Sequence, residues 1–245
     1  LIRLRDKHPI INLILEHREI NKLNNTYVKA LPKVAVSERI HTTFNQTVTS
    51  TGRLSSVNPN IQNIPIRSSR GKLIRKAFKS RSSDFTLLAA DYSQIELRIM
   101  ASLSNDNFMI SAFNNDLDIH SATASKINNV SLEKVTKEMR SDAKAVNFGI
   151  IYGISPHGLS QNLGISRNKA KEIIDSYFNE FKGVKKYMDF LIEEAKNYEF
   201  AKTIFNRKRP LRNINSKNYV LKSFEERIAI NMPIQGTAAD IIKIA

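Results

Sequence analysis

The sequence of 245 residues contains no cysteine. Disulfide bonds and thiolate metal sites are therefore excluded, and any metal ion would be bound by carboxylates or histidines. Long apolar runs are also absent, since none approaches the roughly 20 residues of a membrane-spanning helix, so no membrane partner is expected. The chain begins at Leu1 without a signal-like segment, and Thr237 to Ala245 read as an unfinished helix. We therefore expect an internal piece of a longer protein.

Acidic residues are scarce relative to basic ones. The chain has 38 lysines and arginines against 23 aspartates and glutamates, which gives a formal net charge of +15 at pH 7. Clustered cations gain affinity by displacing counterions from phosphates, so this excess favours nucleic acid as the partner. A basic protein on a membrane surface is the alternative, but the sequence has no cationic helix with a clean apolar face.

The hydrophobic pattern predicts short strands followed by a long helical region. Hydrophobic residues make up 41% of the chain, enough for a packed core. The expected elements are a helix over 1–25 that ends by Pro32, a strand over 42–49, a buried strand over 85–90, a helix over 95–103, helices over 108–226, a basic loop over 207–210 and a helix from 225 onward. This order predicts an α+β fold with a mostly helical subdomain.

One acidic residue lies where a predicted strand ends and a helix begins. The segment reads Asp-Tyr-Ser-Gln-Ile-Glu-Leu-Arg over residues 91–98. A carboxylate at Asp91 would be fixed by rigid backbone yet face solvent, which suits Mg²⁺, because this ion prefers few carboxylates, several waters and substrate phosphates. From this pattern alone, the alternative is that Asp91 or Ser93 only caps the helix.

Four functional groups recur at every fourth residue of the helix predicted from Thr136 to Gly153. They are Arg140, Lys144, Phe148 and Tyr152. Each step of four residues turns a helix by about 400°, so the four groups follow one stripe about 18 Å long. Two cations followed by two rings suit a triphosphate joined to a sugar and a base. An ordinary amphipathic helix with solvated cations and buried rings is the alternative.

Both segments resemble motifs of family A DNA polymerases, the bacterial DNA polymerase I type. The octet 91–98 resembles the first catalytic motif, and the Arg-x-x-x-Lys-x-x-x-Phe-Gly-x-x-Tyr-Gly pattern over 140–153 resembles the nucleotide-binding helix of the fingers. Residues 51–56 and 58–65 also resemble the family. The resemblance implies a monomeric, cytoplasmic enzyme of the bacterial nucleoid that extends primer–template DNA with deoxynucleoside triphosphates.

The resemblance further implies a palm, an antiparallel sheet with helices, that carries a mostly helical fingers subdomain. We expect the base of the thumb and the start of the palm in 1–40, the palm in 41–107, the fingers in 108–225 and a helix returning to the palm in 226–245.

Under this resemblance, residues of the octet contact metal and sugar. Asp91 would bind two catalytic Mg²⁺ ions, and Tyr92 would contribute its backbone carbonyl. Gln94 would lie in the nucleotide site. Glu96 would pack against the sugar of the incoming nucleotide and leave no room for a 2′-hydroxyl, thereby selecting deoxyribose.

The resemblance also assigns roles to the helix stripe. Arg140 and Lys144 would bind the triphosphate, Lys144 would protonate the pyrophosphate leaving group, and His120 would contact the phosphates. Phe148 would lie at the 3′ side of the sugar, where phenylalanine rather than tyrosine implies discrimination against dideoxynucleotides. Tyr152 would lie at the template-base position.

Six residues would contact the DNA. Minor-groove acceptors occur on every base pair, so contacts there test pair geometry rather than sequence. The expected contacts are Arg53 at the primer terminus, Gln62 and Asn63 on the duplex, and Arg227, Asn231 and Gln235 on one helix stripe. The basic segment 207–209 is expected to be a solvated loop near the DNA.

One part of the family pattern is missing. The second catalytic aspartate lies in a His-Asp-Glu turn, and this triplet does not occur in the 245 residues. We therefore expect the isolated chain to be a weak or inactive catalyst. A single-subunit RNA polymerase is one alternative, which Glu96 disfavours. A non-catalytic nucleic-acid-binding fragment is another, but it does not explain the helix stripe.

Overall fold

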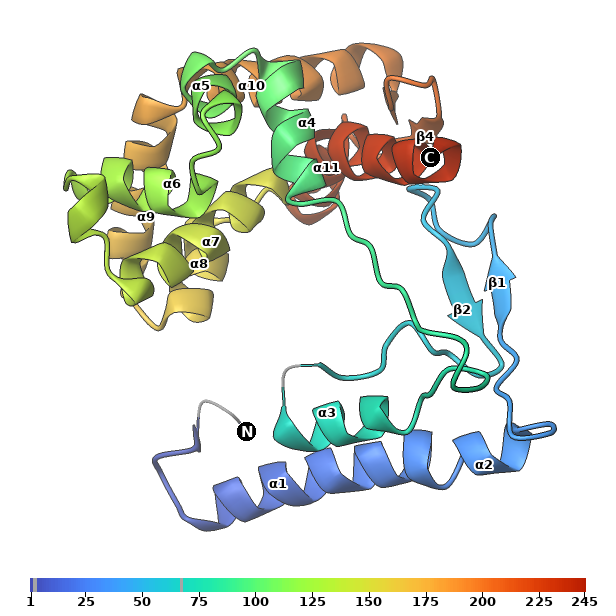
Figure 1. Ribbon diagram of the computed structural model, residues 1–245. Coiled ribbons are helices and arrows are strands. Elements are labelled where there is room, and N and C mark those ends of the chain that lie inside the picture. Colours follow the sequence, from blue (N-terminus) through green and yellow to red (C-terminus); the bar gives the residue numbers. More distant parts are fainter. Residues whose placement is uncertain (2–3, 67) are drawn as a thin grey trace. The chain divides into compact units, whose positions relative to one another are not determined.

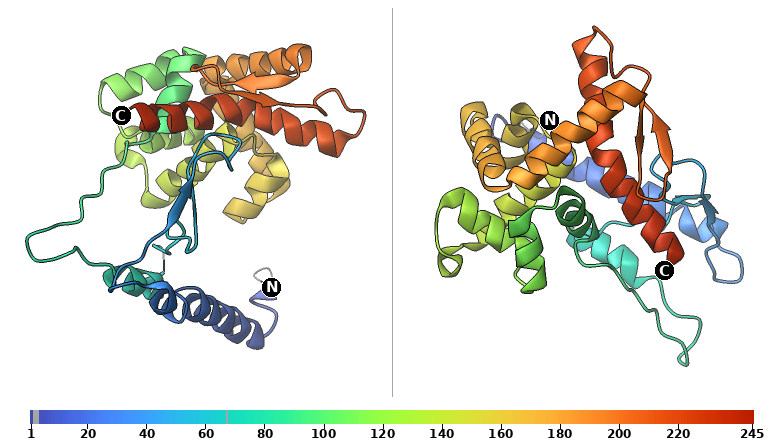
Figure 2. Two further views of the ribbon diagram at one scale, coloured as in Figure 1. Left: turned by 90° about the vertical axis from the view of Figure 1, so that its right-hand side faces the viewer. Right: turned by 90° about the horizontal axis from the view of Figure 1, so that it is seen from above.

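The structure is a computed structural model that describes residues 1, 4–66 and 68–245. Its contacts divide the chain into two compact units. The first unit comprises Leu1–Thr49 and Leu54–Asp91, and the second comprises Ser50–Arg53 and Tyr92–Ala245. Figures 1 and 2 show the helices and strands of each unit.

The first unit combines helices with a small antiparallel sheet. Its elements are α1 (Ile10–Leu23), the π-helical η2 (Asn24–Val28), α2 (Leu31–Val34), β1 (Thr43–Asn45), β2 (Ser55–Val57) and α3 (Ser69–Lys76). Thr43 pairs with Val57 and Asn45 with Ser55. Its core is small and centres on Leu23, Tyr27 and Leu31.

The second unit is mostly helical. Its elements are α4 (Ile95–Ser104), α5 (Asn107–Asn114), α6 (Ile119–Asn128), η3 (Leu132–Lys134), α7 (Lys137–Ile151), α8 (Pro156–Leu163), α9 (Arg167–Glu180), α10 (Lys182–Tyr198), β3 (Phe200–Lys202), β4 (Lys208–Pro210) and α11 (Tyr219–Ile244). Helix α6 packs on α7, α8 on α9 and α4 on α11. A large apolar core joins these helices, and fully buried Leu97, Met109, Ile150, Tyr177 and Phe181 belong to it.

Side-chain caps explain where several of these helices begin. The hydroxyl of Thr136 accepts a hydrogen bond from the Met139 N–H at the start of α7, and Ser155 and Ser166 cap α8 and α9 in the same way. These oxygens pair with N–H groups that have no partner within the helix. Helix α8 ends at Gly164, whose φ of 69° suits a residue without a side chain.

The predicted α+β class is confirmed, since the chain has small antiparallel sheets and is otherwise mostly helical. Helices at 95–104 and through 107–198 also match the prediction, and α11 contains Pro233 in its interior. None of the helices in the described part of the chain is long and apolar enough to cross a membrane.

The predicted buried strand over 85–90 is wrong. These residues have neither helix nor strand structure, and Leu87 and Leu88 are 67% and 90% exposed. A strand requires hydrogen bonds from a neighbouring strand, and no described segment pairs with this one. The apolar composition alone therefore gave a false signal.

Smaller corrections concern element boundaries. The strand expected over 42–49 is limited to β1, because β2 pairs with only three of its residues. Pro32 does not end a helix but lies in the first turn of α2. In a first turn the missing N–H of proline costs nothing, because that N–H would have no partner within the helix. Helix α1 begins at Ile10, and α11 begins at Tyr219, where Asn218 caps it. The segment 207–210 is not a loop, since Lys208–Pro210 form β4 with β3.

Candidate active site

Glu96 lies in the first turn of α4 and is only 7% exposed. Its Oε2 accepts a hydrogen bond from the Tyr152 hydroxyl at 2.7 Å. Its Oε1 forms an ion pair with the guanidinium of Arg53. The residue before the helix, Gln94, has a φ of 55° and contributes no side-chain cap. A buried carboxylate is thus stabilised by two donors, as burial of a charge requires.

A row of rings leads from Glu96 toward α6. The rings of Tyr152 and Phe148 stack with centroids 6.5 Å apart, and Phe148 lies 5.8 Å from the ring of His120. Burial, reinforced by the hydrogen bond to Glu96, raises the pKa of Tyr152 to about 12. The hydroxyl therefore remains protonated and keeps donating to the carboxylate.

His120 lies on α6 and is buried. Burial lowers the pKa of His120; the Asp118 carboxylate opposes this shift, and the nearby cations Arg140 and Lys144 lower the pKa further. The side-chain amide of Asn147 lies 3.1 Å from Nδ1. Because an amide N–H can only donate, Nδ1 accepts and the proton of the neutral ring lies on Nε2. His120 can therefore offer one neutral N–H donor to a ligand.

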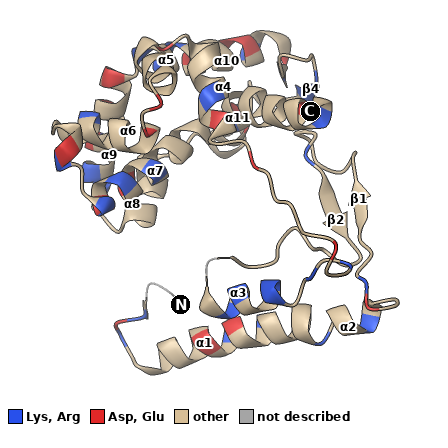
Figure 3. Ribbon diagram, viewed as in Figure 1, with Lys and Arg blue, Asp and Glu red and all other residues tan. Residues whose placement is uncertain are grey.

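The two cations of α7 differ in their surroundings. Arg140 donates two hydrogen bonds to Asp118, at 3.1 Å from Nε and 2.7 Å from Nη2. Asp118 also accepts from the N–H of Ser121 at 2.7 Å and so caps α6. Partial burial opposes ionisation of Asp118, but the bonds from Arg140 and Ser121 outweigh it and lower its pKa to about 2. Lys144 is exposed and has no carboxylate partner in the described part of the chain, and Figure 3 shows the basic segments of α7.

The α11 stripe shares a cavity with Tyr152. This cavity has a volume of about 320 Å³, and its lining includes Arg227, Asn231 and Gln235. Gly153 has a φ of 66°, and a Cβ there would lie 2.9 Å from Cγ of Arg227. Glycine therefore lets the end of α7 approach α11 closely. The structure thus brings Tyr152 together with all three predicted residues of α11.

The remaining predicted residues belong to the first unit or to its boundary. The Gln62 side chain accepts from the N–H of Ser56 at 2.9 Å, and the Asn63 backbone carbonyl accepts from the Tyr27 hydroxyl at 2.6 Å. Asp91 is the last residue of the first unit, Tyr92 is the first residue of the next segment, and both are exposed.

Asp91 is the one carboxylate that was predicted from the sequence to bind metal. No group of three or more histidine, aspartate or glutamate side chains that could hold a metal is found among the described residues. One exposed carboxylate with a neighbouring carbonyl suits an ion that arrives with phosphates and keeps several waters. Two ions held close together need a further carboxylate.

Two contributors to the site were not predicted from the sequence. Asp118 orients Arg140, and Asn147 orients His120. Asp118 directly precedes a helix, which is a recognisable capping position. Its pairing with Arg140, 22 residues away, has no signal in the local pattern.

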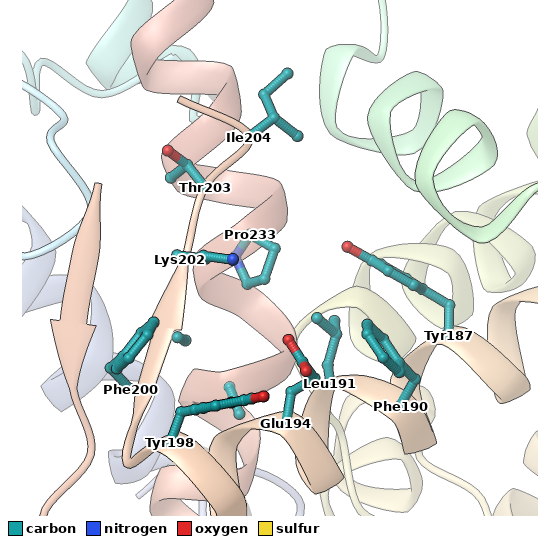
Figure 4. Close-up of a pocket in the computed structure, with 12 residues that line it drawn as sticks. Tyr187, Phe190, Leu191, Glu194, Tyr198, Phe200, Lys202, Thr203, Ile204 and Pro233 are labelled. Carbon is teal, nitrogen blue, oxygen red and sulfur yellow. The ribbon is translucent and has the colours of Figure 1, made fainter. Parts of the chain in front are cut away.

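A second cavity contains none of the predicted site residues. It has a volume of about 300 Å³ and lies between α10, β3 and α11. Figure 4 shows the aromatic side chains that line it, among them Tyr187, Phe190, Tyr198 and Phe200. The aromatic rings around this cavity are therefore separate from the chemistry predicted at Glu96.

Comparisons with known proteins all indicate the same protein family. A sequence model of DNA polymerase family A matches residues 1–245. The chain is 52% identical to DNA polymerase I of Bacillus subtilis and 51% identical to that of Streptococcus pneumoniae R6, in each case over 100% of this chain and 28% of the relative. It therefore spans less than a third of the length of these relatives.

A solved structure is also similar. It is the POL domain of Pol1 from M. smegmatis in complex with DNA primer-template and dNTP, with a TM-score of 0.91 and 44% identity over 98% of this chain and 42% of that one. Since the family match extends over every residue, the chain belongs to DNA polymerase family A.

Proposed function

We propose that the protein containing this chain catalyses template-directed DNA synthesis. In this reaction the primer 3′-hydroxyl attacks the α-phosphate of a deoxynucleoside triphosphate, a phosphodiester bond forms and pyrophosphate leaves. Family membership supports the proposal. The observation that carries it is the buried Glu96, which two donors hold at one end of a row of rings and cations.

The row of side chains on α6 and α7 would bind the triphosphate. Arg140 and Lys144 supply positive charge, and His120 supplies a neutral N–H donor from Nε2. Arg140 is already oriented by Asp118, so it would reach the phosphates from a fixed position. Exposed Lys144 would protonate the departing pyrophosphate.

Glu96 would select the sugar. Its carboxylate is held by Arg53 and Tyr152, so it could not move aside for a 2′-hydroxyl without losing both bonds. Phe148 stacks beside Tyr152 and would pack against the 3′ side of the same sugar, where it would discriminate against dideoxynucleotides. The resulting preference for deoxyribose argues against an RNA polymerase.

Family A polymerases use divalent metal ions, and Asp91 with the Tyr92 carbonyl would hold Mg²⁺ here. When bound, Mg²⁺ neutralises charge that develops on the reacting phosphate and activates the attacking hydroxyl. We propose two ions, with the second carboxylate supplied from outside these 245 residues. Gln94 would lie beside the nucleotide.

Primer–template DNA would be the partner of a monomeric enzyme in the bacterial nucleoid. Arg53 would contact the primer terminus, Gln62 and Asn63 the duplex, and Arg227, Asn231 and Gln235 its minor groove. The cavity shared by Tyr152 and the α11 residues supports a common contact surface in the second unit. The net charge of +15 supports binding to phosphates.

Primer extension on a templated hairpin with Mg²⁺ and deoxynucleotides tests this proposal. We would compare the 245-residue chain with a longer form of the same protein, after circular dichroism confirms that both are folded. Extension by the longer form alone is expected. Extension by the shorter chain would place a second metal-binding carboxylate within it, and no extension by either would favour a binding protein without catalysis.

A further inference from the structure

A buried carboxylate of α11 binds an arginine of the β3–β4 turn. Asp240 is 6% exposed. Its Oδ1 accepts hydrogen bonds from Nε and Nη2 of Arg207 at 2.9 and 2.7 Å. Its Oδ2 accepts from the Thr203 hydroxyl at 2.8 Å. Both oxygens of the carboxylate are therefore engaged, and Oδ1 accepts from two nitrogens of the same charged guanidinium.

The turn that carries Arg207 is itself tightly bonded. The Thr203 N–H donates to the Arg207 carbonyl at 3.0 Å, and the Arg207 N–H donates to the Thr203 hydroxyl at 3.2 Å. The N–H of Ile204 donates to the Thr237 hydroxyl of α11 at 3.3 Å. Figure 4 shows Thr203 and Ile204 just beyond the end of β3. The turn and the helix thus form one rigid support for the arginine.

Arg207 packs directly on the backbone of Gly52. A Cβ at Gly52 would lie 2.6 Å from Nε and 2.8 Å from Cζ of Arg207. Gly52 is buried with a φ of 84°, and its neighbour Thr51 is 7% exposed. A side chain at position 52 would displace the end of Arg207 and would need a φ that residues with a side chain rarely adopt. The guanidinium held by Asp240 therefore lies against the loop Ser50–Arg53.

The next residue along this loop is Arg53, which pairs with Glu96. The Arg53 side chain is 49% exposed. Its backbone belongs to the loop Ser50–Arg53, against which Arg207 packs at Gly52. A chain of contacts thus runs from Asp240 through Arg207 and Gly52 to Arg53 and Glu96.

We infer that Asp240 and Arg207 are positioning residues for sugar selection. They touch no nucleotide, but they fix the loop that holds Arg53 on Glu96 and so keep the Glu96 carboxylate in place. This inference rests on the proposed function, in which Glu96 excludes the 2′-hydroxyl. If the loop relaxes, Glu96 loses one of its two donors and moves aside more readily for a ribonucleotide.

The test measures sugar selectivity in the full protein. We would determine kcat/KM for a deoxynucleotide and for the matching ribonucleotide in wild type, Asp240→Asn, Arg207→Gln and the double variant. Changes transmitted through packed networks are typically worth 0.5–2 kcal/mol, so we expect the deoxy-to-ribo ratio to fall about 2- to 30-fold. The deoxy-to-ribo ratio of the double variant should be no lower than that of the more affected single variant, because the two residues act as a unit.

Glu225→Gln is the matched control. Glu225 is another buried carboxylate of α11, and it accepts from the Asn213 N–H at 2.7 Å and from the Asn213 side chain at 3.1 Å. Its hydrogen bonds come from Asn213 and not from Arg207 or the loop Ser50–Arg53. The ratio is taken within one preparation, so a smaller folded fraction lowers both rates equally and leaves the ratio unchanged. If Asp240→Asn does not fold, Arg207→Lys gives the same test, because it keeps the charge but loses the pair of N–H donors that Asp240 binds.

Two results would overturn the inference while leaving the proposed function intact. One is an active Asp240→Asn protein with the wild-type deoxy-to-ribo ratio. The other is a ratio in Glu225→Gln that falls as much as it does in Asp240→Asn. A wild-type protein that extends no primer would instead contradict the proposed function and the inference with it.

Discussion

At the scale of single residues, Glu96 and Asp118 are two carboxylates of the site that are stabilised in different ways. Glu96 is buried and depends on Arg53 and Tyr152, so loss of either donor leaves a charge poorly compensated. Asp118 is partly exposed, with a side chain 36% accessible, and both caps α6 and orients Arg140. Its contribution is therefore screened by solvent and depends on its ionisation.

This difference predicts a pH dependence for Asp118. Its pKa in the folded chain is about 2, below the ordinary value of 3.8. A lowered pKa contributes stability above pH 3.8, and that contribution is lost as the pH falls toward 2. With screening, we expect Asp118→Asn to lower the free energy of unfolding by about 1 kcal/mol at pH 6. Urea unfolding between pH 6 and pH 2 should show the two proteins converging.

Asp189→Asn is the control for this prediction. Asp189 is an exposed carboxylate paired with Lys185 one helical turn away, and such pairs contribute little. A difference between wild type and Asp118→Asn that persists unchanged at pH 2 would contradict the account of the Arg140–Asp118 pair.

At the scale of helices, one carboxylate caps two elements. Oδ1 of Asp106 accepts from the Met109 N–H of α5 at 3.1 Å, and Oδ2 accepts from the Gly183 N–H of α10 at 3.0 Å. A Cβ at Gly183 would lie 2.8 Å from Cα of Asp106. The glycine therefore permits the approach through which two helices distant in sequence share one cap.

We expect Asp106→Ala to destabilise the protein by about 2–4 kcal/mol, because two caps of about 1–2 kcal/mol each are lost. Asp106→Asn should cost less, since it keeps one acceptor oxygen. Thr136→Ala removes one exposed cap, at the start of α7, and should lower the free energy of unfolding by about 1 kcal/mol. Urea denaturation followed by circular dichroism measures all three, and equal losses for Asp106→Ala and Thr136→Ala would contradict the shared cap.

The helices could be predicted because their signals are local. The long-range contacts could not be predicted, because they have no local signal. Helix α7 has a capping threonine, spacing by four and a glycine end, all of which lie within one segment. The β3–β4 hairpin was missed because its strands are only three residues long and its second strand is basic. The false strand over 85–90 shows the same limit, since a strand depends on a partner that composition does not reveal.

The same reason explains what was missed in the site. The stripe on α7 and the acid at Asp91 could be found from spacing and motif. The bonds of Arg140 to Asp118 and of Arg207 to Asp240 join residues 22 and 33 positions apart. Neither pairing leaves a periodic trace in the sequence, so both required the fold.

At the scale of the whole molecule, the two units differ in the size of their cores. The first unit has three buried apolar residues in its core cluster, whereas the larger core of the second joins helices from α4 to α11. Residues 81–91 are exposed and have neither helix nor strand structure. Resistance to unfolding should therefore be unequal along the chain.

Brief trypsin digestion of the full protein tests this expectation. Within these 245 residues, we expect the earliest internal cuts at Lys79 and Arg81, while α4 to α11 remain in one large fragment. Mass spectrometry would identify the products. First cuts within α7 or α10 would contradict the assignment of the stable core to the second unit.

Single-nucleotide primer extension by wild type and Asp91→Asn tests the central claim most directly. We expect the wild-type protein to add only the complementary deoxynucleotide. Because the loss of a metal ligand removes several kcal/mol of transition-state stabilisation, Asp91→Asn should react about 1,000-fold more slowly while it still binds primer–template DNA. Extension by Asp91→Asn at the wild-type rate would contradict the account of this chain as part of the catalytic module of a DNA polymerase.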